Sequence, residues 1–356
     1  MTSRKAVARL PFLVLVPVLC VYLNSNVWAQ DDGETGTLHR TIVVHPMSTG
    51  PKDSGTELLE AMASITEAAP GIGDAGPGIM TASATNPWLI KLDAGVYDLG
   101  TASLVMKPYV DIEGSGEGVT KITAVGNNSN VTSGTVIGAS NAELRFLTVE
   151  NTGGGTFNAA VIINSASPKL THVTLSASTG NGAISVTTVG LFIGSASSSP
   201  VELTDVRVII APAALAPGTQ AFNLGIWFGS PYAGGGTVRL RDVTVSVGAI
   251  TSTTPGLAFA IGIETYGEVG PSSLMLEDVT IVAADYGLTL GYGTPPTTVN
   301  RSTINGGKAA VAFAPFSTGT IGSSQLIGGV SNEGATLTTC VGDYNGSYSP
   351  LNSSCQ

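Results

Sequence analysis

Charged residues are scarce in this chain: they make up 11% of its 356 residues, with 15 basic residues against 25 acidic ones. Disordered chains carry more charge and fewer β-branched residues, so disorder is excluded. The sequence contains no basic cluster, and an excess of acidic residues repels nucleic acid and anionic lipid. A strongly anionic polysaccharide would likewise need a local basic patch or a bridging cation. We therefore expect no nucleic-acid partner.

Histidine and cysteine are also rare. The three histidines, His39, His45 and His172, lie too far apart in the sequence to indicate a catalytic triad or a zinc site. One of the three cysteines precedes residue 30, which leaves Cys340 and Cys355. Neither has a neighbouring histidine or a CxxC partner, so a reactive thiol is disfavoured. In an exported protein this pair is expected to form a disulfide that closes the C-terminal tail.

The first 29 residues have the pattern of a secretory signal peptide. Three basic residues precede an apolar run over residues 10–23, and Val27-Trp28-Ala29 suits the cleavage positions. The run is shorter than the roughly 20 residues of a membrane span, and two prolines interrupt it. We expect a protein secreted to the extracellular space or cell envelope, with no membrane span after cleavage. Cleavage removes three basic residues and no acidic one, which leaves a net charge of −13.

Glycine and apolar residues are abundant instead. The chain has 46 Gly and 19 Pro and is 43% hydrophobic, while helix-forming residues are few. This composition is typical of a β-rich extracellular protein, and it supplies enough apolar material for a large core.

A six-residue motif occurs seven times; five copies have apolar residues in the first, fourth and sixth places, and the last two are weaker copies. Its clearest copy is Leu240-Arg241-Asp242-Val243-Thr244-Val245. The first residues of successive copies are 26, 33, 37, 36, 23 and 22 positions apart, which is the spacing of solenoid repeats. The other copies begin at Leu144, Leu170, Leu203, Leu276, Val299 and Ile321.

The motif predicts a bend at its third residue. Side chains alternate along a straight strand, so the first and fourth residues cannot face the same side of one. If the third residue forms a corner, Leu240, Val243 and Val245 all point into one core. Coils stacked about 4.8 Å apart then place like residues on like residues.

A second short strand is expected between consecutive motifs. If the apolar residues that flank the centre of each strand point inward, the central residues form a column on the outer surface. Loops around residues 179–189, 211–222, 230–237 and 248–258 are expected to project from the shaft. The outward column consists of Phe192, Trp227, Glu264, Thr289 and Ala312.

One helix is predicted, over residues 56–65. Thr56 can cap it, and Leu58, Leu59, Met62 and Ile65 fall on one face. A solenoid exposes the unpaired edge of its terminal coil, so we expect this helix to cover that end.

Two segments after the helix carry a resemblance to a known family. Pro87–Tyr97 and Val110–Ile122 resemble the opening of pectin-lyase-like right-handed parallel β-helix proteins, among them the pectin methylesterases. Gly138–Arg145 and Ser167–Val173 are similar to segments of secreted bacterial β-helix proteins of unassigned function. The resemblance covers roughly residues 40 to 330. It implies an all-β, single-stranded right-handed parallel β-helix, a solenoid, with an N-terminal capping helix.

The expected organisation has four parts. They are a signal peptide (residues 1–29), an N-terminal segment (30–55), the β-helix with its capping helix (56–330) and a C-terminal tail with the disulfide (331–356).

The repeated aspartates are the first candidate for chemistry. Asp205, Asp242 and Asp278 recur at one motif position, and stacked carboxylates could bind Ca²⁺. Aspartate also accepts the unusual backbone conformations of turns, which makes it a suitable corner residue. We favour the interpretation that these aspartates are corner residues, so no cofactor is expected. Bound Ca²⁺ is the alternative.

The outward column is the second candidate. Aromatic faces stack on sugar rings, and a neighbouring carboxylate can bind hydroxyl groups or act as an acid or base. The alternative, which we favour slightly, is that Phe192 and Trp227 form a secondary core beneath the loops. The candidate ligand-binding residues are Phe192, Trp227, Tyr232, Glu264, Tyr266, Asp285 and Tyr292.

The catalytic motifs of the similar enzymes are missing. Pectin methylesterases use two aspartates with a glutamine and an arginine, yet this chain has no Asp-apolar-apolar-Phe-Gly segment and no Arg-Pro-Trp. We therefore favour a non-catalytic protein with a glycan-binding or surface-adhesive role, its partner a polysaccharide or cell-surface glycan. The alternatives are a polysaccharide lyase or carbohydrate esterase with a lateral groove beside Glu264, and a structural component of an envelope or matrix. The sequence does not specify an oligomeric state.

Overall fold

The computed structural model describes residues 40–356 except for 68–79, 127–130, 181–184, 197–198, 217, 230–235, 252–257, 267–272, 292–295 and 333–336. The predicted signal peptide and residues 30–39 lie outside the described residues.

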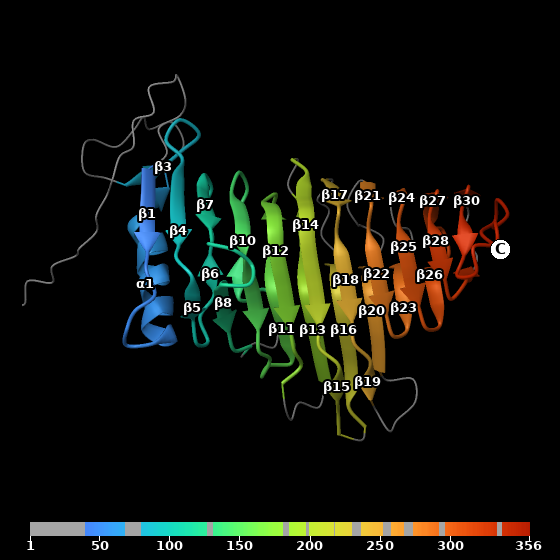
Figure 1. Ribbon diagram of the computed structural model, residues 1–356, viewed down its shortest axis with the longest axis horizontal. Helices are drawn as coiled ribbons and strands as arrows, with labels where there is room; N and C mark the ends of the chain where they lie inside the picture. The colour runs from blue at the N-terminus through green and yellow to red at the C-terminus, as the bar shows by residue number, and fades with distance from the viewer. Residues whose placement is uncertain are drawn as a thin grey trace, which may run out of the picture.

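Two long parallel sheets run side by side along the molecule, and the coils follow one another in chain order along its long axis (Figure 1). The chain returns to both sheets in every regular coil, and the strands range from two to 12 residues in length. The first sheet has 18 strands: β1 (Arg40–Val44), β4 (Trp88–Leu92), β5 (Gly95–Asp98), β7 (Val110–Glu113), β8 (Thr120–Ala124), β10 (Glu143–Asn151), β12 (Lys169–Ala177), β14 (Val201–Ile210), β17 (Thr237–Arg241), β18 (Thr244–Val247), β21 (Ser273–Glu277), β22 (Thr280–Ala283), β24 (Thr297–Asn300), β25 (Thr303–Gly306), β27 (Thr318–Gly322), β28 (Gln325–Ile327), β30 (Leu337–Val341) and β31 (Tyr344–Asn345).

The second sheet lies opposite the first and has nine strands. They are β6 (Leu104–Val105), β9 (Val136–Ile137), β11 (Phe157–Ala166), β13 (Ser185–Ala196), β16 (Gln220–Gly229), β20 (Ala258–Tyr266), β23 (Tyr286–Leu290), β26 (Ala309–Phe313) and β29 (Val330–Asn332). Connections between parallel strands of one sheet are right-handed in nearly all proteins. The fold is the right-handed parallel β-helix that the resemblance to pectin-lyase-like proteins implies.

Two small parallel sheets complete the strand inventory. One pairs β2 (Thr66–Glu67) with β3 (Thr81–Ala82), and the other pairs β15 (Ala213–Ala214) with β19 (Ile250–Thr251). β15 and β19 lie in two of the segments expected to project, and they extend beyond the main sheets (Figure 1). A third such segment, 179–189, is partly wrong, because β13 begins at Ser185 and pairs there with β16.

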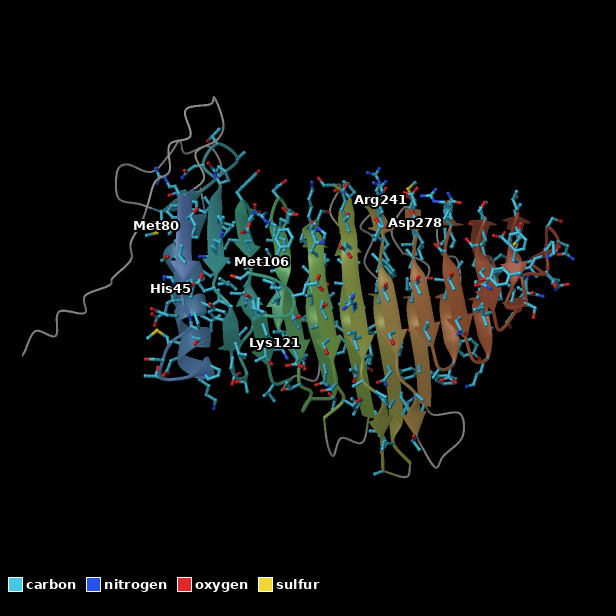
Figure 2. All side chains as sticks on the ribbon, viewed as in Figure 1. His45, Met80, Met106, Lys121, Arg241 and Asp278 are labelled. Carbon is cyan, nitrogen blue, oxygen red and sulfur yellow. A yellow bond between two sulfur atoms is a disulfide. The ribbon has the colours of Figure 1, made fainter. Side chains whose placement is uncertain are left out.

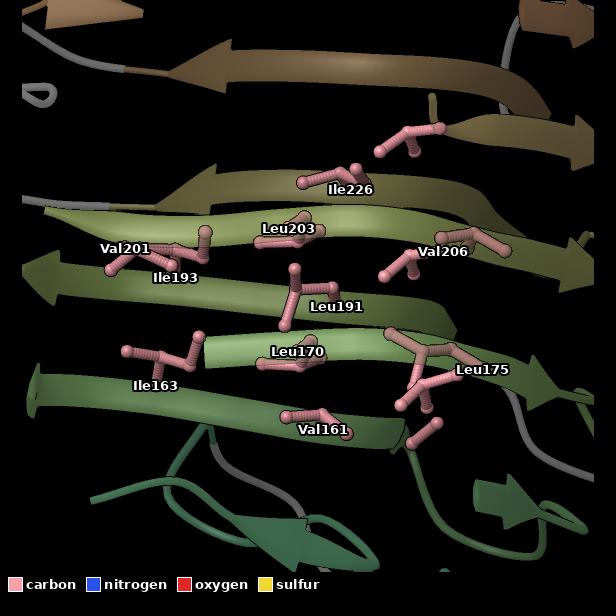
Figure 3. Packing of buried hydrophobic residues seen from close by; sticks show 14 of the residues in the cluster. Val161, Ile163, Leu170, Leu175, Leu191, Ile193, Val201, Leu203, Val206 and Ile226 are labelled. Atoms are coloured by element: carbon pink, nitrogen blue, oxygen red, sulfur yellow. The ribbon is translucent and has the colours of Figure 1, made fainter. Parts of the chain in front are cut away.

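The third residue of every motif copy forms the predicted corner. All seven have left-handed backbone conformation, with φ between 48° and 56°. In the clearest copy, Leu240, Val243 and Val245 are all buried in the same core. Figure 3 shows this core farther toward the N-terminus, with Leu170 and Leu203 of the first sheet among Val161, Leu191 and Ile226 of the second. The corner residues are Phe146, His172, Asp205, Asp242, Asp278, Arg301 and Ser323.

A column of glycines lets the two sheets approach each other. Gly190, Gly225, Gly262 and Gly287 occupy equivalent places in four consecutive strands of the second sheet. A Cβ atom at Gly225 would lie 2.3 Å from Cγ1 of Val245, and the other three would lie 2.2 to 2.4 Å from a side chain of the first sheet. At these four places only a residue without a side chain fits, whereas Ala160 and Ala310 occupy the equivalent places on the adjacent coils.

The helix α1 (Pro51–Ser64) packs against the first coils at the N-terminal end of the shaft, as predicted (Figure 1). It begins five residues earlier than expected, because Gly50 is the N-cap and Pro51 the first helical residue. Thr56 therefore lies inside the helix, where its hydroxyl donates to the carbonyl of Lys52. Pro51 is compatible with this start because a first-turn residue needs no hydrogen-bonded N–H. Among the described residues, no helix is both long enough and apolar enough to cross a membrane.

The regular coils continue past residue 330, which we expected to be their end. β30 and β31 pair with β27 and β28, and Gly342, at the corner between them, has a φ of 70°. Cys340 thus begins an eighth copy of the motif. Its fourth residue is the buried Asp343 and its sixth is Asn345, so two of the three apolar places are polar, which is why the sequence pattern missed it.

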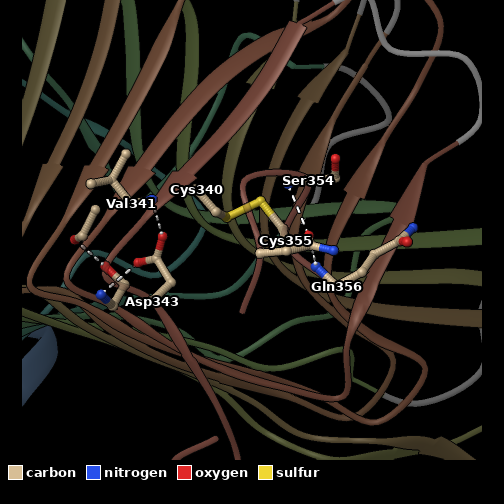
Figure 4. The surroundings of a disulfide bond; sticks show 9 residues. Cys340, Val341, Asp343, Ser354, Cys355 and Gln356 are labelled. Carbon is tan, nitrogen blue, oxygen red and sulfur yellow. Dashed lines mark hydrogen bonds between the residues drawn. A yellow bond between two sulfur atoms is a disulfide. The ribbon is translucent and has the colours of Figure 1, made fainter. Parts of the chain in front are cut away.

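The predicted disulfide between Cys340 and Cys355 is present, with 5.2 Å between the two Cα atoms (Figure 4). It joins the last coil to a tail that folds back over it, where the N–H of Cys340 donates to the carbonyl of Ser353. The tail therefore covers part of the edge that the last coil would otherwise expose.

Candidate functional site

The outward column predicted from the sequence exists in the second sheet. Phe192 pairs with Trp227, Trp227 with Glu264, Glu264 with Thr289 and Thr289 with Ala312, each on the next coil. Their side chains point away from the main core, because their strand neighbours Leu191, Ile226 and Ile263 belong to it.

The N-terminal part of this column is a secondary core. Phe192 is only 3% exposed and belongs to a cluster distinct from the interior of the shaft. Its ring centroid lies 5.9 Å from that of Phe157 and 5.0 Å from that of Trp227, which packs against the same cluster. For Phe192 the structural alternative holds, because a ring this deeply buried has no face free for a sugar.

Glu264 follows Trp227 in the column and has a different environment. Burial raises the pKa of its carboxyl group to about 7. None of the ion pairs between described residues includes Glu264, so no cation compensates for this burial. A carboxyl group that titrates near neutral pH can donate or accept a proton under physiological conditions.

The two register partners of Glu264 each carry a polar atom without a hydrogen-bond partner. In the described part of the chain, Trp227 Nε1 and Thr289 Oγ1 are both shielded from solvent and unpartnered. Leaving such a group unpaired costs about 1–3 kcal/mol, and native proteins contain few of them. Because Trp227 and Thr289 are the register partners of Glu264 on either side, the three groups form one run across three coils. We call this run the polar triplet.

Asp285 does not join the polar triplet. Its carboxylate binds Lys308 at 2.9 Å and accepts a 2.8 Å hydrogen bond from the N–H of Ala260, four residues before Glu264 along β20. The Lys308 ammonium group also lies 5.0 Å from the ring centroid of Phe259. These contacts give Asp285 a structural role at the opposite end of the strand. Tyr232, Tyr292 and the side chain of Tyr266 lie outside the described residues.

The repeated aspartates are corner residues, and the carboxylates of Asp205 and Asp278 have side-chain partners on neighbouring coils. Asp205 pairs with His172 at 2.5 Å, and Asp278 pairs with Arg301 at 2.7 Å. The hydrogen bond from Arg301 holds the pKa of Asp278 below its usual value. In the sheet beside this corner, Arg241 pairs with Glu277 at 3.1 Å, and Figure 2 shows Arg241 and Asp278 near the same edge of the shaft. No group of three or more His, Cys, Asp or Glu side chains among the described residues could hold a metal ion.

A polar hollow on the first sheet was missed by the sequence analysis. Arg145 is surrounded by Asp111, Glu113 and Glu143 at 2.8 to 3.3 Å. Beside it lies an open cavity of about 400 Å³, lined by Asp111, Glu143, Lys169 and Glu202 among others. Lys169 in turn pairs with Glu202 at 3.6 Å. Three carboxylates and one ammonium group line the cavity, and Arg145 beside it is shared by three carboxylates, so the hollow is acidic overall.

No family model and no curated protein sequence matches the chain. Among solved structures, the A-module of a mannuronan C-5 epimerase from Azotobacter vinelandii is similar, with a TM-score of 0.41 and 14% identity over 74% of this chain and 82% of that one. The pectin methylesterase from Yersinia enterocolitica gives a TM-score of 0.41 and 12% identity over 75% and 88% of the two chains. That from Erwinia chrysanthemi gives 0.41 and 10% over 87% and 91%. Likeness at this level carries no argument about activity.

Proposed function

We propose that the protein is an extracellular, non-catalytic glycan-binding protein and that its ligand contacts the polar triplet of Trp227, Glu264 and Thr289. The observation that carries the proposal is a pair of unpartnered polar atoms, Trp227 Nε1 and Thr289 Oγ1, on the two coils that flank the buried carboxyl group of Glu264. A chain of sugar hydroxyl groups supplies hydrogen-bond donors and acceptors that repeat along its length. Trp227 Nε1 and Thr289 Oγ1 are shielded from solvent, so the proposal requires neighbouring side chains to move before a ligand can bond to these two atoms.

The charge of the chain favours a neutral glycan. The mature protein is strongly acidic, and the charged side chains of the first sheet are largely paired with one another. An anionic polysaccharide would meet repulsion without a basic patch to offset it. The disulfide fits an oxidising compartment such as the cell exterior, where polysaccharides are the common surface polymers.

Affinity electrophoresis and titration calorimetry against galactomannan, xyloglucan and β-glucan, with polygalacturonate as the anionic comparison, test this proposal. Thr289→Val and Glu264→Gln should weaken binding to a neutral polymer. Thr298→Val and Glu57→Gln, which alter exposed residues elsewhere, should not. Absence of binding to every neutral polymer would contradict the proposal and leave a structural role in an envelope or matrix.

A carbohydrate-active enzyme is the second candidate, and the raised pKa of Glu264 is the observation that favours it. Glycoside hydrolysis uses a pair of carboxylates that flank the scissile bond. The register partners of Glu264 are a tryptophan and a threonine, so the described residues beside it supply no second carboxylate. Assays for reducing ends, unsaturated products and methanol release on the same polymers, with and without Ca²⁺, decide between the two functions.

A further inference from the structure

The surroundings of Glu264 restrict the protonation state in which its carboxyl group can bind a ligand. On β16, the Trp227 ring packs against the Phe192 cluster, and on β23 the neighbour is the uncharged Thr289. The nearest charged pair on these strands, Asp285 with Lys308, lies at the level of Ala260 and is internally neutralised. Among the described residues, therefore, no charged group faces Glu264 from the strands packed against it.

Resting on the function proposed above, we infer that Glu264 binds its ligand as a neutral carboxylic acid and that binding takes up one proton from solution when the free carboxyl group is ionised. A ligand laid over Trp227 and Thr289 removes the remaining solvent contact of Glu264. Further desolvation disfavours the charged form, and no cation among the described residues offsets it.

The hydrogen-bonding capacity of the site agrees with this form. The indole N–H of Trp227 needs an acceptor, and the hydroxyl group of Thr289 can donate or accept. A neutral carboxyl group adds one donor and one acceptor, which match a ligand hydroxyl group in both roles. An ionised carboxylate only accepts. The neutral form therefore matches a ligand hydroxyl group better than the ionised form does.

The direction of the pH dependence follows by linkage. The pKa of free Glu264 is about 7, and the bound form holds the proton more tightly. Below this pKa the carboxyl group is already protonated, so affinity is constant. Above it, each binding event must bring in a proton, and the association constant falls about tenfold per pH unit.

Calorimetry in buffers of different ionisation enthalpy measures this uptake, with the tightest-binding member of the galactomannan, xyloglucan and β-glucan panel as the probe. Above neutral pH the wild type and Glu57→Gln should take up about one proton per site. Glu264→Gln should bind with no uptake and with an affinity independent of pH. Proton release, or pH-independent binding by the wild type, would overturn the inference and leave the proposed function standing. Failure to bind any polymer at any pH would contradict both the inference and the proposed function.

A ligand-free measurement tests the premise separately. The indole N–H resonance of Trp227, assigned with Trp227→Phe, should titrate with a midpoint near pH 7 in the wild type. In Glu264→Gln it should be flat. A flat wild-type titration would overturn the inference even if glycan binding were pH dependent, because another group would then be responsible.

Discussion

The backbone N–H of Ser324 donates a 2.7 Å hydrogen bond to the carboxylate of Asp343, one coil farther along the shaft. The same link recurs toward the N-terminus, where Ser302 N–H donates to Ser324 Oγ and Val279 N–H to Ser302 Oγ, both at 3.1 Å. The other carboxylate oxygen of Asp343 accepts from Val341 N–H at 2.9 Å (Figure 4). The fourth motif residue is apolar in the middle coils and becomes polar in the last three. Each polar side chain there satisfies a backbone donor of its own or the preceding coil.

We expect Asp343→Asn to change how stability depends on pH. Burial raises the pKa of Asp343, so the native state binds this proton more tightly than the unfolded chain does. The resulting stabilisation is fully present below the unfolded pKa and is lost as pH rises through the native pKa. The advantage of the wild type over Asp343→Asn should therefore be largest in acid and should shrink with rising pH. Thermal unfolding across the acid range measures it.

Asp278→Asn is the matched comparison and should behave in the opposite way. Arg301 lowers the pKa of Asp278, so its contribution is present above the unfolded pKa and is lost as pH falls through the native pKa. Equal pH dependence in the two variants would contradict both assignments.

A side chain at Gly225 should destabilise the shaft. A Cβ atom there meets Val245 at 2.3 Å and the carbonyl oxygen of Gly262 at 2.4 Å, and neither can move without shifting a sheet. Overpacking of this kind costs about 1–3 kcal/mol, so the denaturant midpoint of Gly225→Ala should fall clearly. Gly118→Ala is the control, because nothing lies within 4 Å of its added Cβ atom. A midpoint for Gly225→Ala equal to that of the control would show that the sheets can separate freely.

The corner conformation predicts different tolerances at Asp242. Its φ of 55° is left-handed, which glycine and asparagine accept and β-branched residues do not. Asp242→Val should lower the free energy of unfolding by about 1–2 kcal/mol relative to Asp242→Gly. Thr244→Val, two residues later on the exposed face of β18, should change it little. Equal stability of the valine and glycine variants at position 242 would be inconsistent with the corner.

Removing the disulfide should loosen the C-terminal end. Cys340 and Cys355 close a loop with a sequence separation of 15, and such a bond stabilises by about 2–4 kcal/mol. The double Cys→Ser variant should unfold at lower denaturant concentration than the wild type, and reductant should shift only the wild type. A wild-type midpoint unaffected by reductant would contradict a stabilising role for the bond.

The sequence alone was sufficient to predict the repeating coil and the corner at the third residue of its motif. The alternation of side chains along a strand is a local rule, so the spacing of Leu240, Val243 and Val245 required a bend at Asp242. The same reasoning placed Trp227 and Glu264 in one outward column. It failed at the last coil, where Asp343 and Asn345 take apolar places of the motif, because the donors that hold the Asp343 carboxylate come from the preceding coil and from Val341 across the corner. It also missed the start of the helix at Gly50 and Pro51.

Only the tertiary structure decided what the outward column is. Phe192 and Glu264 occupy equivalent places in their strands, yet one is part of a secondary core and the other is a partly buried carboxyl group with a pKa of about 7. Burial and pKa depend on all the atoms that pack around a side chain, most of which are distant in sequence. The sequence therefore determined which residues stack along the shaft, and the packing of neighbouring coils decided which of them lie in a secondary core.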